Sequence, residues 1–308
     1  MTTIDLSTPP PPPSSLLDGL PRRVTLTLPE LQLVAERAGG APLPFDVAAP
    51  AAVSALEARL GASRGSSDDQ AYRAALDALH DPVTTLARRG LLRDDVLDEG
   101  LAGAVGLLAT PTYAVDLDVA VGDAQVKAWH RAQDDAVATL ATSDGVVFEL
   151  AWFATSAWPA ELGRVAVLPE DLELRSSAVP PGVDLPYELL DATVEAVTTG
   201  RADLLPLLAD QRAGSVLDAH GRPVFAAELP ALLQALGAEA QGRLRVLVAD
   251  VSTERTDVVG VRSWVLLADG WRSLRPHRDR GTPRVELRSV DAADLARDLA
   301  PVLREVAR

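Results

Sequence analysis

The chain has 308 residues, of which 47% are hydrophobic, so it is long enough to bury a substantial core as one large domain or two. Its formal net charge of −15 and its isoelectric point near 4.7 repel phosphate backbones and argue against nucleic acid as a partner. It contains no cysteine, which excludes disulfides and the common cysteine-based zinc and redox sites and suits a reducing compartment.

The first 20 residues have the composition of a disordered tail. An unbroken proline run, Pro9 to Pro13, favours polyproline II and cannot join a helix or sheet interior; docking to a proline-recognising domain is the alternative. No positively charged start followed by an apolar segment marks a signal peptide, and no apolar run is long enough to span a bilayer. We therefore expect a cytoplasmic protein without membrane insertion.

One strand and several helices are expected before residue 110. Alternating apolar residues predict a strand over Arg23–Leu28, and Thr27 with Glu30 three residues later predicts a capping box that opens a helix. Further helices are expected at Ala51–Leu60, from a capping box at Ser67 and Gln70, at Val83–Arg89, and from a cap at Asp94 or Asp95 to Ala109.

The run from Tyr113 to Trp152 predicts a four-strand meander. Its first strand has apolar residues at every second position, which is typical of an antiparallel sheet with one buried face: Tyr113, Val115, Leu117, Val119 and Val121. Asp144–Gly145 lies between two β-rich runs and predicts a hairpin with a type I′ turn, because that turn needs positive φ at both central residues.

A hard break at Pro180–Gly182 is the predicted boundary between two halves, residues 21–180 and 181–308. Before it, residues 165–168 and 172–174 predict short strands or extended chain. After it, three helices are expected, opened at Pro186, Ala202 and Pro230, with Gly237 ending the third.

A second meander, Leu244 to Ser289, repeats the parts of the first, with Asp269–Gly270 at its hairpin. Asp291 is expected to cap a final helix that contains Pro301. Two Asp-Gly hairpins could occur by chance, but helices, first strand and hairpin recur in matching order. We therefore predict two similar α+β halves that share one sheet.

No catalytic, cofactor-binding or metal-binding pattern emerges. The four histidines have no partner at ligand spacing: His80, His130, His220 and His277. Gly61 to Gly65 matches the G-x-S-x-G pattern, but a helix is expected before it where hydrolases have a strand, which favours a loop. Gly100, Gly103 and Gly106 favour close helix packing, and Asp134–Asp135 favours a solvated loop over an acid/base pair. The search favours a binding protein over an enzyme.

Several short segments follow one another in a characteristic order along the chain. They are Val24-Thr-Leu-Thr-Leu28 before a helix, Leu86-Ala-Arg-Arg-Gly-Leu-Leu92, Leu107-Leu-Ala-Thr-Pro111 before Val115-Asp-Leu-Asp-Val119, and Trp264-Val-Leu-Leu with Trp271-Arg-Ser-Leu-Arg-Pro276. In this order the sequence resembles the EspG family, cytosolic chaperones of mycobacterial and related type VII (ESX) secretion systems, from Arg23 to about Val306. The resemblance implies an α+β fold: a central, largely antiparallel sheet with two helical bundles and pseudo-two-fold repeated halves.

The resemblance also implies a non-enzymatic role without cofactor. Such a protein binds the apolar helical tip of PE–PPE-type substrates, or of another helical hairpin, and delivers them to the secretion system as a monomer or weak dimer. We place candidate protein-binding residues on the second meander, at Val258, Val261, Trp264 and Leu266, with plain sheet core as the favoured alternative for all four. Two other functions stay open: a hydrolase or transferase with a distributed site, and a module that self-associates through sheet edges.

Overall fold

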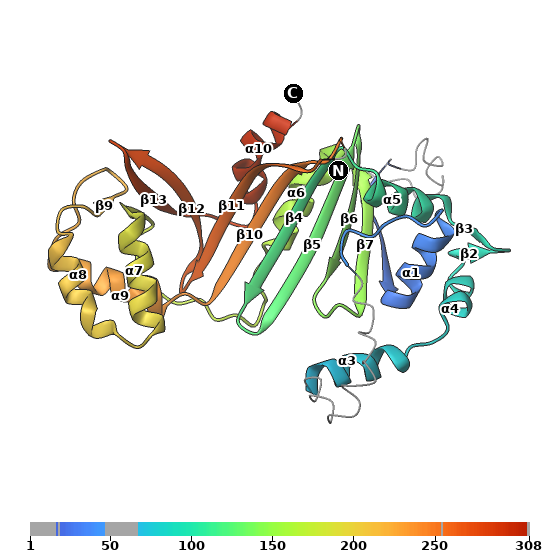
Figure 1. Ribbon diagram of the computed structural model, residues 1–308, viewed down its shortest axis with the longest axis horizontal. Helices are drawn as coiled ribbons and strands as arrows, with labels where there is room; N and C mark the ends of the chain where they lie inside the picture. The colour runs from blue at the N-terminus through green and yellow to red at the C-terminus, as the bar shows by residue number, and fades with distance from the viewer. Residues whose placement is uncertain (1–16, 18, 47–66, 254, 307–308) are drawn as a thin grey trace, which may run out of the picture. The chain divides into compact units, whose positions relative to one another are not determined.

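A computed structural model describes residues 17, 19–46, 67–253 and 255–306 (Figure 1). The predicted N-terminal tail up to residue 16, the helix expected at Ala51–Leu60 and the G-x-S-x-G segment lie outside the described residues. The chain divides into two compact units. The first comprises Met1–Thr112, His130–Leu140 and Gly145–Trp158, and the second comprises Tyr113–Trp129, Ala141–Asp144 and Pro159–Arg308.

The first unit combines an antiparallel sheet with four described helices. Its strands follow the order β1-β7-β6-β5. The elements are β1 (Arg22–Thr27), α1 (Leu28–Arg37), α3 (Ser67–Asp77), α4 (Pro82–Arg88), β2 (Leu92–Arg93), β3 (Val96–Leu97), α5 (Glu99–Ala109), the end of β5 (Ala124–Gln133), β6 (Ala136–Thr142), β7 (Val147–Ala154) and the 3-10 turn η1 (Thr155–Ala157).

The predicted capping box at the start of α1 is confirmed. The Thr27 backbone N–H donates to Glu30 Oε2 at 2.9 Å, and the Glu30 N–H donates to Thr27 Oγ1 at 3.4 Å. Two N–H groups that the helix itself cannot satisfy are thereby paired. Leu31 and Val34 of α1 are then fully buried.

Glu30 also ties α1 to α4. Its Oε1 accepts the Thr85 hydroxyl at 2.6 Å, and the Arg89 guanidinium lies 3.3 Å from both carboxylate oxygens. Burial raises the pKa of the Glu30 carboxyl, but the Thr85 and Thr27 hydrogen bonds and the Arg89 charge outweigh burial and hold this pKa below its ordinary value of 4.5.

We expect Glu30→Gln to cost about 1 kcal/mol of stability at neutral pH, because the charged cap and the contact with Arg89 are lost. Because the pKa of Glu30 is lower in the folded state than in the unfolded state, the charged carboxylate stabilises the protein fully above pH 4.5. This stabilisation disappears as the pH falls through the folded-state pKa. The difference in unfolding free energy between wild type and variant, measured by urea denaturation, should therefore shrink below pH 4.5. A difference that stays constant down to pH 3 would contradict this assignment.

The prediction that Asp94 or Asp95 caps α5 is wrong. The capping residue is Asp98, whose Oδ1 accepts the Leu101 backbone N–H at 3.0 Å. Asp94 and Asp95 have φ values of +49° and +64° and form the turn between β2 and β3. Aspartate tolerates this left-handed region better than most residues, so the same residue type serves both in turns and at caps.

The second unit carries the larger part of the sheet, with strand order β5-β4-β10-β11-β12-β13-β8-β9. Its elements are β4 (Tyr113–Val121), the start of β5, α6 (Trp158–Val165), β8 (Gly182–Pro186), α7 (Tyr187–Thr198), η2 (Ala202–Leu204), α8 (Leu205–Gln211), β9 (Leu217–Asp218), α9 (Leu229–Ala238), β10 (Gly242–Asp250), β11 (Asp257–Leu267), β12 (Gly270–Asp279), β13 (Thr282–Ser289) and α10 (Asp294–Val306).

Strands β4 and β10 pair antiparallel over their full length, from Tyr113↔Asp250 to Val121↔Gly242. The order of elements is repeated along the chain. A strand leads directly into a helix (β1–α1, β8–α7), and a four-strand meander later leads into another helix (β4–β7 before α6, β10–β13 before α10). The predicted α+β fold with a large antiparallel sheet is confirmed.

Both Asp-Gly turns differ from the type I′ prediction. Only the glycines have positive φ, +71° at Gly145 and +132° at Gly270. Within the second meander, two consecutive positive φ values occur instead at Arg280 and Gly281, +47° and +86°, where β12 turns into β13. The sequence signal misses this hairpin because arginine is an unusual residue for a left-handed position.

Residues 165–168 were predicted as a strand or extended chain, but Val165 is the last residue of α6. The cap prediction at Asp291 also needs correction, because the helix starts three residues later and the Asp294 carboxylate accepts the Asp291 N–H at 2.9 Å. Pro301 lies inside α10 as expected.

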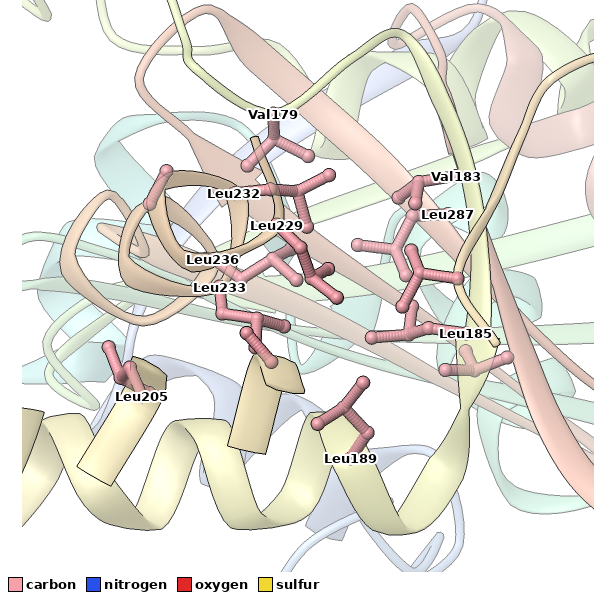
Figure 2. Packing of buried hydrophobic residues seen from close by; sticks show 14 of the residues in the cluster. Val179, Val183, Leu185, Leu189, Leu205, Leu229, Leu232, Leu233, Leu236 and Leu287 are labelled. Atoms are coloured by element: carbon pink, nitrogen blue, oxygen red, sulfur yellow. The ribbon is translucent and has the colours of Figure 1, made fainter. Parts of the chain in front are cut away.

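Helices α7, α8 and α9 pack their leucines on β8 and β13 (Figure 2). Gly237 was predicted to end the third of the expected helices, but it lies inside α9. A Cβ atom there would come within 2.5 Å of Val197 Cγ2 on α7. The glycine therefore allows α7 and α9 to approach closely. It does not end α9, whose last residue is Ala238.

Candidate protein-binding surface

Helix α10 covers one face of β11. Trp264 Nε1 donates to the Asp298 carboxylate on α10 at 3.0 Å, and Gly260 lies against Val302. Trp264 and Leu266 share this face and are 1% and 0% exposed. These two of the four predicted binding residues are therefore core residues, and Trp264 contacts α10 directly.

Asp298 fixes the position of α10 on the strands. Its carboxylate also accepts Arg275 Nη2 at 3.2 Å, and its backbone carbonyl accepts Arg262 Nε at 3.3 Å. The side chain of Asp298 is only 9% exposed, so these donors replace the water that it gives up on burial.

The other two predicted residues, Val258 and Val261, are exposed at 57% and 38%. Residues three apart on a regular strand point to opposite faces. Here the register changes between β10 and β11: Val248 pairs with Gly260, but Ala249 pairs with Val258. The extra residue, Val259, forms a β-bulge that turns Val258 and Val261 to the same face, opposite α10.

This face continues across β10 and β4 with paired charges. Arg245 lies directly opposite Asp118 in the ladder, and Asp118 also accepts Gln125 Nε2 at 2.9 Å and lies 4.0 Å from Arg243. Figure 1 shows α10 passing behind β10 and β11, which leaves the side toward the viewer without a helix there. We call this surface the open face; its residues are Asp118, Arg243, Arg245, Leu247, Val258 and Val261.

The N-terminal half of β11 also has an edge that does not pair with β12. Strands β11 and β12 pair only from Ser263↔Leu274 to Leu267↔Gly270, while β12 continues to Asp279 paired with β13. Figure 1 shows β12 and β13 turning away from β11 beyond this point. Within the described part of the chain, Asp257–Arg262 pairs with β10 on one side and with no strand on the other.

Among the remaining candidates, Gly100, Gly103, Gly106 and Asp134–Asp135 line one cavity of about 690 Å³ in the first unit, whereas the histidines do not converge. His130 is buried and its Nδ1 accepts Trp158 Nε1 at 2.9 Å, while His277 Nε2 lies 3.1 Å from Asp184. His80 and His220 are exposed. Across the residues that the structure describes, no group of three or more histidine and acidic side chains could hold a metal ion. None of the helices described is both long and apolar enough to cross a bilayer.

Sequence reasoning missed the charged residues of the open face, Arg243, Arg245 and Asp118. Their signal is present in the alternation of Arg243 and Arg245 with buried Leu244 and Val246. This alternation indicates that one face of β10 is polar. It does not indicate which strands pair with β10.

The open face thus belongs to an α+β protein with a large antiparallel sheet, helices on the sheet and a repeated order of elements. No protein-family model matches the sequence, and no curated protein matches it. Fourteen chains of solved structures match the fold. One is the type VII secretion system chaperone EspG5 of Mycobacterium tuberculosis, solved in complex with a PE25-PPE41 dimer. It is 13% identical, with a TM-score of 0.60 over 92% of this chain and 96% of that chain. The chain therefore has an EspG-like fold, as the sequence resemblance predicts.

Proposed function

We propose that the protein is a cytosolic chaperone or adaptor that binds PE–PPE-type substrates of a type VII secretion system, without catalysis or cofactor. The observation that carries the proposal is the likeness of nearly the whole chain to EspG5, which was solved with a PE–PPE dimer bound. Function belongs to sites and not to folds, so the proposal also depends on the open face.

The open face has the chemistry of a binding surface for a partly apolar partner. Val258 and Val261 expose aliphatic side chains beside Leu247, which is half-buried, while Arg243 and Arg245 supply charge at the border. Interfaces commonly combine an apolar centre with a polar rim. An exposed apolar helical tip would aggregate in water, and covering it on such a surface keeps it soluble. The net charge of −15 supports solubility of the complex.

The proposal is tested by co-expressing the chain with a PE–PPE-like pair encoded beside it. We expect one soluble complex whose mass, from light scattering after size-exclusion chromatography, equals the sum of its members. A pair that purifies alone, with no shift in size on mixing with the chain, would contradict the proposal.

The double variant Val258→Asp with Val261→Asp should weaken this complex at least tenfold, because carboxylates would replace aliphatic side chains at the apolar part of the surface. Val83→Asp is the matched control, since Val83 is 41% exposed but lies on α4 in the first unit. Isothermal titration calorimetry gives the affinities. Equal affinity for the double variant and the control would show that the open face does not contact the client.

A further inference from the structure

We propose that the unpaired edge of β11, Asp257–Arg262, binds an extended acidic segment of the partner as an added strand. The inference takes the existence of a protein partner from the proposed function and adds how one segment of it is held. Every strand has backbone N–H and C=O groups on both sides. Those of Asp257–Arg262 that point away from β10 meet no strand in the described structure. One of its carbonyls, that of Val261, accepts the half-buried guanidinium of Arg262 at 3.0 Å, and an incoming strand would displace this contact.

The edge is flanked by side chains that suit an extended peptide. A strand added beside β11 would place alternate side chains on the open face, next to Val258 and Val261. Its other side chains would point toward the Asp298 side, where Arg262 and Arg275 already converge. Aliphatic residues fit the first set of positions, and carboxylates fit the second.

The charge of the neighbouring hairpin selects an acidic partner. Between Trp271 and Ser289 the sequence has six arginines and two acidic residues, and four of the arginines already form ion pairs within the chain: Arg272, Arg275, Arg284 and Arg288. Arg278 and Arg280 at the hairpin tip are exposed, and neither has a carboxylate partner among the described residues. A segment with alternating aliphatic and acidic side chains therefore matches both the apolar and the basic part of the site.

The same charges disfavour a second copy of this chain as the occupant. A symmetric dimer through this edge would apply the same surface to itself and bring two arginine-rich hairpins together. Like charges at an interface oppose association. Self-association through this sheet edge is therefore the weaker alternative.

The first strand of the sheet shows how an edge is closed in this protein. The Thr25 carbonyl of β1 accepts Arg89 Nη2 at 2.6 Å, so a side chain from another element already occupies it. Natural proteins protect their edges in this manner. On β11 the Val261 carbonyl accepts Arg262 Nη1, but this side chain belongs to β11 itself, and Val258 and Val261 stay exposed beside it.

The test uses a fluorescent, end-capped seven-residue peptide of alternating valine and glutamate, with fluorescence anisotropy as readout. We expect saturable binding that weakens about fivefold when lysine replaces glutamate and that weakens further with salt. A peptide with proline at every second position should not bind, because it cannot complete the ladder. Amide hydrogen exchange should slow at Asp257–Arg262 in the bound state. No binding, equal binding of the proline peptide, or protection elsewhere would overturn the proposal.

Two variants sharpen the result. Arg278→Glu should weaken the glutamate peptide about fivefold, whereas Arg88→Glu, an equal charge change on exposed α4, should leave it unchanged. A concentration-dependent dimer that protects Asp257–Arg262 would assign the edge to a second copy and overturn the acidic partner. If the PE–PPE pair binds but the peptide does not, strand addition is wrong and the proposed function stands. If the peptide binds but the pair does not, the proposed function is wrong and strand addition stands.

Discussion

Gly242→Val is expected to destabilise the protein by about 3 kcal/mol. Gly242 begins β10, where a Cβ atom would come within 2.6 Å of the Ala120 carbonyl oxygen on β4 and 3.1 Å of the Leu266 side chain. The obstacle on the β4 side is backbone, which cannot move without opening the β4–β10 ladder. Urea denaturation followed by circular dichroism measures the loss.

Gly103→Ala is the control for this prediction. Apart from the neighbouring backbone of α5 itself, no described atom lies within 4 Å of a Cβ built at Gly103, which is exposed. Alanine is the better helix former, so this variant should gain about 0.5–1 kcal/mol. A Gly242→Val variant that unfolds at the wild-type urea concentration would show that β4 and β10 are not held at the described spacing.

Asp269→Ala is expected to cost about 3 kcal/mol. Arg272 is 1% exposed, and its Nη2 donates to both Asp269 carboxylate oxygens at 2.8 and 2.7 Å, while Nη1 donates to the Ser289 hydroxyl. Removing Asp269 leaves a buried guanidinium without its counter-charge, which is the costly way to break a buried ion pair.

A variant of Arg272 tests whether the loss at Asp269→Ala comes from the unpaired buried charge. Arg272→Met removes the buried charge and keeps much of the volume, so it should cost less than Asp269→Ala, and adding it to Asp269→Ala should restore part of the lost stability. The four unfolding free energies form a double-mutant cycle. Additive effects within 0.5 kcal/mol would refute a coupling between the two residues.

Local signals predicted much of the fold. The Thr27–Glu30 capping box depends on residues three apart, and the strict alternation from Tyr113 to Val121 depends on one strand, so both could be seen in the sequence. Asp269 shows the limit of such signals. It stands in an Asp-Gly pair typical of a turn, but its carboxylate holds Arg272, which the sequence does not reveal.

The candidate site depended on contacts between distant segments. Alternation correctly groups Trp264 with Leu266, yet the contact that holds Trp264 comes from α10, whose Asp298 lies 34 residues later in the sequence. Val258 and Val261 share a face only because β11 bulges against β10. The unpaired edge likewise follows from where β12 leaves β11, and no residue pattern within β11 predicts it.

The most direct measurement of the central claim is amide hydrogen exchange of the chain alone and with a bound PE–PPE-like pair. Binding of the partner on the open face predicts slower exchange in β11 from Asp257 to Ser263, with unchanged exchange in α4 of the first unit. Unchanged exchange along β11, with slower exchange confined to other elements, would contradict the claim that this face of the sheet holds the partner.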